Sequence, residues 1–268
     1  MKYFNHLKQV LFITVAFSCH TTFADNIIKV AASDFPPYTI ISGKSITGID
    51  IILANKLTQK LGLSIEYVRC PWKRCLKLMK YGRIDMLTGV YKRPEREAYM
   101  LFLTPYYFEA TNSFYIRSES SLNIKQYDDL KKLKIGLERG TQAFEPFDSD
   151  INLDKYEVNK LSQAMKMTTL ARLDTFIGAT IPTNYLLLKT NNQNNFKRAS
   201  FAIKSKKTYA YFTLSKTSKY HTKLDKFNKA LKYLETSGEI KKTFKLFSLG
   251  GDIPKYPIDT SPLQAKSL

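Results

Sequence analysis

The segment YKRPERE, residues 91–97, places three cations and two anions around one proline, directly after the apolar run RIDMLTGV. Pro94 has the fixed φ that suits the first position of a helix, so Glu95, Arg96 and Glu97 would form a first turn. The planar guanidinium of Arg96 can hold a carboxylate with two parallel hydrogen bonds. In the alternative interpretation, Arg96 only pairs with a neighbouring glutamate at the surface.

Cysteines suggest a second kind of chemistry. Cys70 and Cys75 bracket the sequence CPWKRC. Pro71 disfavours the helical conformation at Cys70, which should therefore lie extended before a helix that contains Cys75. An extended Cys70 can fold back onto Cys75, so we expect a disulfide. The spacing is not the CxxC of redox enzymes, and without a partnering histidine we expect no metal site.

The first 24 residues have the features of a secretory signal peptide. Lys2 and Lys8 flank a polar start, LFITVAF is apolar but too short to span a membrane, and small residues precede a cleavage site after Ala24. Lipid attachment at Cys19 is the disfavoured alternative, because the residues before it match a lipoprotein signal poorly. We expect an exported, soluble protein of the periplasm.

The chain is basic, with a formal net charge of +19 over 268 residues. A basic balance can indicate nucleic-acid binding. The excess is spread, however: residues 25–116 and 117–206 each carry +5, and residues 207–268 carry +7. Lysines of the last segment occupy the face opposite an apolar set at helical spacing, namely Leu224, Phe227, Leu231 and Leu234. We therefore expect a solvated lysine face and no nucleic-acid partner.

Alternating strands and helices must position these groups. NIIKVAAS, LSIEYV and RIDMLTG read as strands, separated by a helix from Gly48 to Gly62 and by the helix WKRCLKLMKY. This order predicts a parallel sheet with crossover helices. The pattern then restarts with a short helix at Asp128, the strand KLKIGL, a helix after GTQ and a strand near KYEV.

An internal echo suggests two lobes of similar build. KLMKYGRIDMLTG (77–89) aligns with KMTTLARLDTFIG (166–178). The final helices need an apolar surface, so the chain should leave lobe 1 near Phe114 and return near Tyr209. The expected division is lobe 1 at 25–113 and 208–250, lobe 2 at 114–207, and a tail at 251–268. Two crossings form a hinge, and ligand should lie between the lobes.

In this order and at these spacings, several motifs resemble family 3 of the periplasmic solute-binding proteins, which serve ABC importers of polar amino acids. They are DFPPY, YGRIDML, the charged turn ending in Arg96, FLTPYY, DDLKKLKIGLERGT and LETSGEIKK. The resemblance covers nearly the whole mature chain. It implies an α/β fold of two lobes (type II), each a mostly parallel sheet flanked by helices.

The resemblance also implies ligand-binding residues. Arg96 falls where the family's arginine holds the ligand carboxylate. Phe35 and Trp72 fall at or near aromatic positions of the cleft, although either could serve ordinary packing. Gly89 and Tyr91 fall in the segment that offers donors to the carboxylate, where the family prefers small hydroxyl residues.

In lobe 2 the same comparison points to Thr141 and Gln142, which should follow a strand, open a helix and close on the ligand. The largest departure comes after LDTFIG. Amino-acid binders usually have a carboxylate there for the ligand's ammonium group, but this chain has Ala179 and Thr180. Asp34, Glu109 or Glu138 could replace it.

We expect a monomeric binding protein without a cofactor, which delivers a small carboxylate-bearing solute to the membrane subunits of an ABC importer. Two other classes compete. A dehydratase-like enzyme on this scaffold would need a general acid in the cleft. A sensor domain would normally continue into a membrane helix and a kinase.

Overall fold

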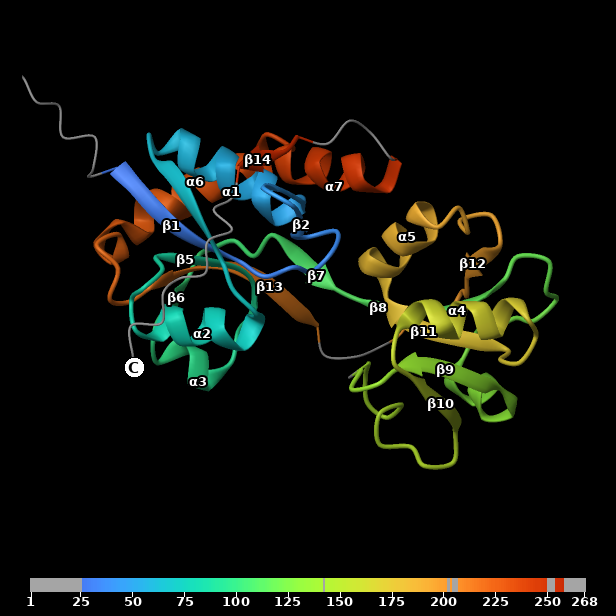
Figure 1. The fold of residues 1–268 in the computed structure, drawn as a ribbon. Helices are drawn as coiled ribbons and strands as arrows, with labels where there is room; N and C mark the ends of the chain where they lie inside the picture. The colour runs from blue at the N-terminus through green and yellow to red at the C-terminus, as the bar shows by residue number, and fades with distance from the viewer. Residues whose placement is uncertain (1–25, 142, 202, 204–206, 250–253, 258–268) are drawn as a thin grey trace, which may run out of the picture.

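The computed structural model describes residues 26–141, 143–201, 203, 207–249 and 254–257. The molecule has two units, each built on its own large sheet (Figure 1). We call the unit with the six-stranded sheet lobe 1 and the unit with the five-stranded sheet lobe 2. The expected signal peptide, its cleavage site after Ala24 and the alternative lipid site at Cys19 lie outside the described residues.

Lobe 1 is built on a mixed sheet in the order β4-β1-β5-β13-β6, with β7 also paired to β13. Its strands are β1 Ile27–Ala32, β4 Ser64–Arg69, β5 Met86–Tyr91, β6 Met100–Phe102, β7 Phe108–Ala110 and β13 Thr208–Ser215. The three strands predicted to be parallel, β1, β4 and β5, are parallel. Strand β13 runs antiparallel to β5 because it re-enters the sheet from lobe 2.

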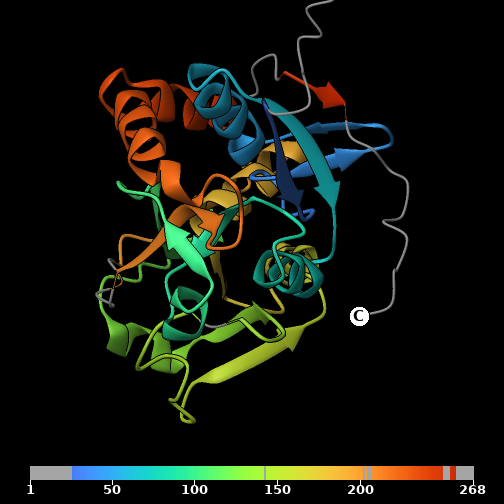
Figure 2. The same ribbon diagram turned by 90° about the vertical axis from the view of Figure 1, so that its left-hand side faces the viewer.

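Helices cover both faces of this sheet. They are α1 Ile49–Lys60, α2 Trp72–Lys80, the single turn α3 Pro94–Glu97, the 3-10 turn η3 His221–Lys223, α6 Leu224–Thr236 and α7 Glu239–Leu249. Figures 1 and 2 show α1, α6 and α7 on one face and α2 on the other. Gly238, with φ +77°, separates the last two helices.

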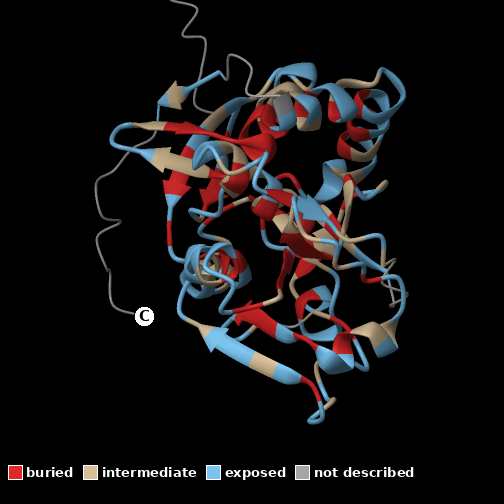
Figure 3. Ribbon diagram, turned by 90° about the vertical axis from the view of Figure 1, so that its right-hand side faces the viewer, coloured by how far each residue is buried: buried red, intermediate tan, exposed pale blue. Residues whose placement is uncertain are grey.

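Lobe 2 is built on the sheet β10-β9-β11-β8-β12. Its strands are β8 Asn112–Arg117, β9 Lys134–Glu138, β10 Asp154–Val158, β11 Thr175–Ala179 and β12 Phe196–Arg198, and its helices are α4 Leu161–Thr169, α5 Thr180–Lys189 and the 3-10 segment η2 Tyr127–Lys132. A small sheet beside lobe 1 joins β2 Ile40–Ser42, β3 Ser45–Thr47 and β14 Tyr256–Pro257. Figure 3 shows the buried residues concentrated on the strands and on the helix faces turned to them.

The chain passes between the sheets twice. It leaves after β7, which ends at Ala110, and returns before β13, which begins at Thr208. The lobes also touch through helices, because Tyr185 of α5 lies beside Phe247 of α7 with ring centroids 6.2 Å apart.

The prediction of a helix after GTQ is wrong, because the described residues that directly follow this motif form no helix. Residues 145–149 form turns, and Thr141 precedes them in a loop. Pro146 has no N–H to continue a helix and restricts Glu145 before it. Phe144 and Phe147 are buried in the lobe 2 core, which holds the loop against the lobe without a helix.

The echo seen in the sequence has a structural counterpart. Asp85 accepts a hydrogen bond from the Lys29 N–H at 2.8 Å, and Asp174 accepts one from the Lys134 N–H at 2.8 Å. In each lobe the aspartate before a central strand thus anchors that strand to its neighbour.

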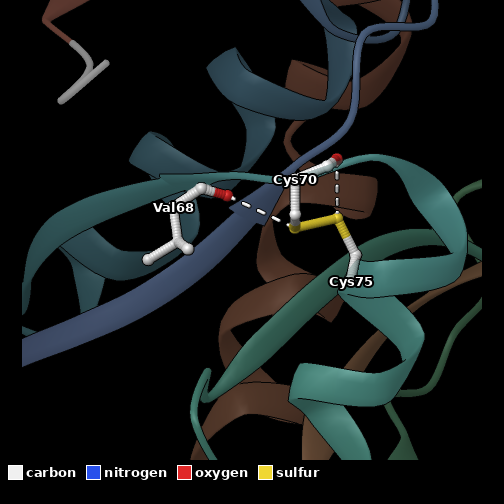
Figure 4. The surroundings of a disulfide bond; sticks show 3 residues. All are labelled: Val68, Cys70 and Cys75. Carbon is white, nitrogen blue, oxygen red and sulfur yellow. Dashed lines mark hydrogen bonds between the residues drawn. A yellow bond between two sulfur atoms is a disulfide. The ribbon is translucent and has the colours of Figure 1, made fainter. Parts of the chain in front are cut away.

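The predicted disulfide is confirmed. Cys70 and Cys75 are bonded, with their Cα atoms 5.4 Å apart (Figure 4). Pro71 is the N-cap of α2, which begins at Trp72 as predicted, and the Pro71 carbonyl accepts from the Cys75 N–H at 3.0 Å. The disulfide therefore ties the end of β4 to the first turns of α2.

Over the described part of the chain, no helix combines the length and the apolar character that crossing a membrane requires.

Candidate functional site

A pocket of about 390 Å³ opens at the ends of the lobe 1 strands β1 and β5. Its walls come from the loop after β1, the start of α1, the start of α2, the end of β5 and the turn α3. The lining residues are Ala31, Ser33, Asp34, Phe35, Tyr38, Thr39, Asp50, Trp72, Leu87, Thr88, Gly89, Tyr91, Arg93, Arg96 and Phe108. All of them belong to lobe 1, and they include six of the eight ligand-binding residues predicted from the sequence.

Arg96 lies in this pocket and is only 9% exposed. Its Nη1 donates to the carbonyl of Tyr91 at 2.8 Å, and its guanidinium carbon lies 5.9 Å from the centre of the Trp72 ring. Burial, with Arg93 nearby, lowers the pKa of Arg96. No ion pair between described residues involves Arg96, so its charge is held by a carbonyl and an aromatic ring.

The glutamates of the segment pair with its other two cations. Lys92 Nζ lies 2.9 Å from Glu97 Oε1, and Arg93 Nη1 lies 4.0 Å from Glu95 Oε1, all on half-exposed side chains. The helix begins at Pro94 as predicted. The turn therefore neutralises Lys92 and Arg93 locally, whereas the guanidinium of Arg96 stays available in the pocket.

An aromatic stack forms one wall. Phe35 stacks on Tyr38 at 5.6 Å between centroids, and Tyr38 stacks on Phe108 at 4.8 Å. Phe35 is 56% exposed, so one face is open to a ligand. Trp72 lines the pocket and also packs against the core beside α2.

Asp50 is a pocket residue that the sequence patterns did not single out. It lies in the first turn of α1, is 3% exposed, and accepts a hydrogen bond from the Tyr107 hydroxyl at 2.6 Å. Burial raises the pKa of Asp50 to about 6, and hydrogen bonds from Tyr107 and Thr88 oppose part of that rise. Its position next to Ile49 on a buried helix made it look like part of the helical pattern rather than a site residue.

Gly89 lies directly over Asp50. It has φ +68°, a conformation that favours glycine, and a Cβ built on it would lie 3.2 Å from Asp50 Oδ2. Tyr91 lines the pocket two residues further along β5, and burial followed by the charge of Asp50 raises the pKa of its phenol.

Of the two residues predicted in lobe 2, Thr141 is described and does not line this pocket. The Thr141 N–H donates to the Glu138 carbonyl at 3.0 Å in the loop after β9. Gln142 lies outside the described residues. In the arrangement of the lobes seen here, none of the described lobe 2 residues lines the lobe 1 pocket.

A group of hydroxyls stands where the sequence lacked the expected carboxylate. Thr180 Oγ1 lies 3.0 Å from Thr111 Oγ1 and 2.8 Å from Ser113 Oγ, and the Tyr115 hydroxyl donates to the Thr180 carbonyl at 3.2 Å. Ala179 is exposed and forms the N-cap of α5 without a side-chain hydrogen bond. This end of α5 is polar but uncharged.

The three acidic residues considered as replacements differ in their surroundings. Asp34 lines the pocket, is exposed, and accepts from the Ile41 N–H at 3.1 Å. Glu109 pairs with Lys207 at 3.1 Å. Glu138 lies in lobe 2 and accepts from the Leu161 N–H at 3.0 Å.

Two relatives match this chain over most of its length. The arginine-binding extracellular protein ArtP of Bacillus subtilis is 25% identical over 228 residues, which cover 84% of this chain and 86% of ArtP. The L-cystine-binding protein TcyA of the same organism is 25% identical and covers 78% of this chain and 75% of TcyA.

The fold agrees with solved structures. The L-cystine solute receptor of Neisseria gonorrhoeae, in its unliganded open conformation, superposes with a TM-score of 0.70 at 22% identity, over 85% of this chain and 94% of the receptor. The family model for bacterial extracellular solute-binding proteins, family 3, matches residues 27–248. With its two lobes and a pocket at the strand ends of the first, the chain belongs to this family of extracytoplasmic solute-binding proteins.

Proposed function

We propose that the protein captures a small solute with a carboxylate, most simply an α-amino acid, between its lobes and delivers it to an ABC importer. The observation that carries the proposal is Arg96. It is 9% exposed, lines the pocket and makes no ion pair with the described residues. Since a buried cation without an anion is costly, a ligand carboxylate would complete the site.

The pocket also suits the rest of such a ligand. Phe35 offers an exposed ring, and the guanidinium of Arg96 lies over the ring of Trp72. The relatives ArtP and TcyA are named for binding arginine and cystine, which makes these amino acids the first solutes to try. Thr141 and Gln142 would contact the ligand from lobe 2 after closure.

A thermal-shift and calorimetric screen over amino acids, aromatic acids and dicarboxylates tests the proposal, because a ligand that binds only the folded protein raises its melting temperature. Replacement Arg96→Ala should weaken binding of the best ligand by about 2–5 kcal/mol. Arg96→Lys should rescue little, since a point charge cannot form two parallel hydrogen bonds.

Lys92→Ala is the matched control from the same turn, because Lys92 is half-exposed, paired with Glu97 and outside the pocket lining, and Arg93→Ala, at a cation that is also half-exposed and paired but lines the pocket, is compared with it. They should slow association slightly, and only at low salt. Equal losses for all three variants would mean that the turn is a diffuse basic rim, and undiminished binding by Arg96→Ala would remove Arg96 from the site.

Closure of the lobes is a separate test. None of the described residues of lobe 2 lines the pocket in the present arrangement, so ligand should draw the lobes together if both take part in binding. Small-angle scattering should then show compaction at saturating ligand. An unchanged profile would limit the site to lobe 1.

A dehydratase-like enzyme has one observation in its favour, because Asp50, whose pKa burial raises to about 6, could donate a proton in the pocket. We expect no reaction, since the named relatives are binding proteins. Incubation with prephenate, followed by the absorbance of the aromatic product, measures this. Turnover that disappears in Asp50→Asn would establish the enzyme.

A further inference from the structure

Two opposite charges line the lobe 1 pocket without neutralising each other. Arg96 is 9% exposed and Asp50 is 3% exposed, and both line the same cavity. Among the described residues, no ion pair joins them or involves either one. Burying a charge without a partner is costly, and burying two that do not meet is doubly so. Such a pair suits a ligand that carries both charges.

We infer that Asp50 binds a positively charged group of the ligand while Arg96 binds its carboxylate, so that lobe 1 alone recognises a zwitterion. The inference rests on the proposed function, because it presupposes the carboxylate at Arg96. The family's amino-acid binders usually have a carboxylate after β11 for the ligand's ammonium group, but here Ala179 and the hydroxyls of Thr180, Thr111 and Ser113 carry no charge. The inference assigns this role to Asp50 in the first turn of α1.

Gly89 gives the ligand access to this carboxylate. A Cβ at position 89 would lie 3.2 Å from Asp50 Oδ2, so a side chain there would crowd this oxygen, which lines the same pocket as Gly89. The other oxygen, Oδ1, already accepts from Tyr107. A carboxylate has about four lone-pair sites, so the hydrogen bonds from Tyr107 and Thr88 leave capacity for a donor of the ligand.

Both charged residues contact the end of the same strand, β5. Asp50 lies against Gly89, and Arg96 donates to the carbonyl of Tyr91, two residues further along the same strand. Both charges are thus fixed to one short stretch of backbone, which suits a small zwitterion.

Other acidic residues are poorer candidates. Glu109 is neutralised by Lys207, and Glu138 lies in lobe 2 outside the pocket. Asp34 lines the pocket but is exposed, so water competes there for the ligand's cation. Only Asp50 is both in the pocket and shielded from water.

The positive group could be the α-ammonium of an amino acid or a cation on its side chain. Three probes distinguish these sources: L-arginine, L-citrulline with an uncharged side chain of similar shape, and 5-guanidinopentanoate, which lacks the α-ammonium. Calorimetric titrations near neutral pH would compare the parent with Asp50→Asn. Asparagine keeps the shape and an oxygen for Tyr107, and thermal unfolding checks that the variant is folded.

Asp50→Asn should bind L-arginine about 30-fold or more weakly than the parent. If the α-ammonium is the partner, citrulline shows the same loss and 5-guanidinopentanoate none; if the side-chain cation is the partner, these two results are exchanged. Asp225→Asn, an exposed aspartate of α6 outside the pocket, is the matched control and should bind as the parent does.

The inference is overturned if Asp50→Asn binds all three probes as tightly as the parent, or if Asp34→Asn causes the larger loss. Failure of the proposed function looks different, because the parent itself would then bind no amino acid, aromatic acid or dicarboxylate of the screen, and both proposals would fall. A second readout is specific to Asp50: near pH 6 the parent should release a proton on binding L-arginine, and Asp50→Asn should release none.

Discussion

The strand β5 of lobe 1 and the strand β11 of lobe 2 are built alike but end differently. Each is preceded by an aspartate that holds the neighbouring strand, Asp85 at Lys29 and Asp174 at Lys134. Strand β5 ends at Tyr91 and is followed by the turn with Arg96, whereas β11 ends at Ala179 and runs directly into α5. The shared unit sets the backbone, and the residues after each strand set the chemistry.

The same contrast holds for the two glycines of the echo. Gly89 lies against the carboxylate of Asp50, whereas a Cβ on Gly178 would meet Thr183 and Leu161 inside lobe 2. One glycine exposes a charge to the pocket and the other permits close packing. The charged groups of the candidate site therefore gather on lobe 1.

The buried acid of lobe 1 should make stability depend on pH. Because burial raises the folded pKa of Asp50 to about 6 from 3.8, the folded protein binds a proton between these values that the unfolded chain lacks. The resulting stability is complete below about pH 4 and is lost as the pH rises through about 6, roughly 3 kcal/mol in all.

Urea unfolding of the ligand-free protein at several pH values measures this effect. Asp50→Asn should be more stable than the parent at neutral pH, and the difference should vanish in acid. Besides Tyr107 and Thr88, the charge of Asp50 acts on Tyr38, Tyr67 and Tyr91, whose phenols stay protonated throughout this range because their pKa values are raised. A difference independent of pH would mean that Asp50 does not titrate as stated.

The two anchoring aspartates should differ in strength. Asp85 accepts from the Lys29 N–H at 2.8 Å and from the Ser218 hydroxyl at 2.5 Å, whereas the one side-chain hydrogen bond described for Asp174 comes from Lys134. Asp85→Ala should lower the free energy of unfolding by roughly 2–3 kcal/mol and Asp174→Ala by roughly 1–2 kcal/mol. Chemical denaturation of both variants measures this difference, and a larger loss for Asp174→Ala would contradict the predicted order.

The disulfide stabilises lobe 1 alone. The chain has three cysteines, and the bonded pair is Cys70 with Cys75. Since the closed loop is short, reduction should cost about 2 kcal/mol, the low end of the usual range. Hydrogen exchange should accelerate in β4 and α2 and stay unchanged in β9 and β11. Faster exchange in both lobes would show that the lobes unfold as one unit.

A carboxylate added to lobe 2 should have the smallest effect. Ala179 is the exposed N-cap of α5 and makes no capping hydrogen bond, so Ala179→Asp should stabilise the protein by about 1 kcal/mol. Ala179→Asn is the uncharged control. We expect ligand affinity to change little; a large gain with Asp alone would place the ligand's cation beside lobe 2 and contradict the role of Asp50.

The sequence determined the scaffold and one end of the site. Pro94 at a helix start, the disulfide between Cys70 and Cys75, and the echo before β5 and β11 are local signals, because each depends on neighbouring residues within a few turns of chain. Arg96 could be found for the same reason. The helix expected after GTQ failed because Pro146 and the burial of two phenylalanines outweighed the local pattern.

Only the tertiary structure decided the second charge. Asp50 looks like any polar residue of a helix until Tyr107, 57 residues away, donates to it and Gly89, 39 residues away, leaves it open to the pocket. Its burial, its pKa and its access to a ligand all come from segments that meet only when the sheet forms. A sequence pattern reports what a residue's neighbours in the chain require, whereas the environment of a buried carboxylate is made by residues distant in the chain.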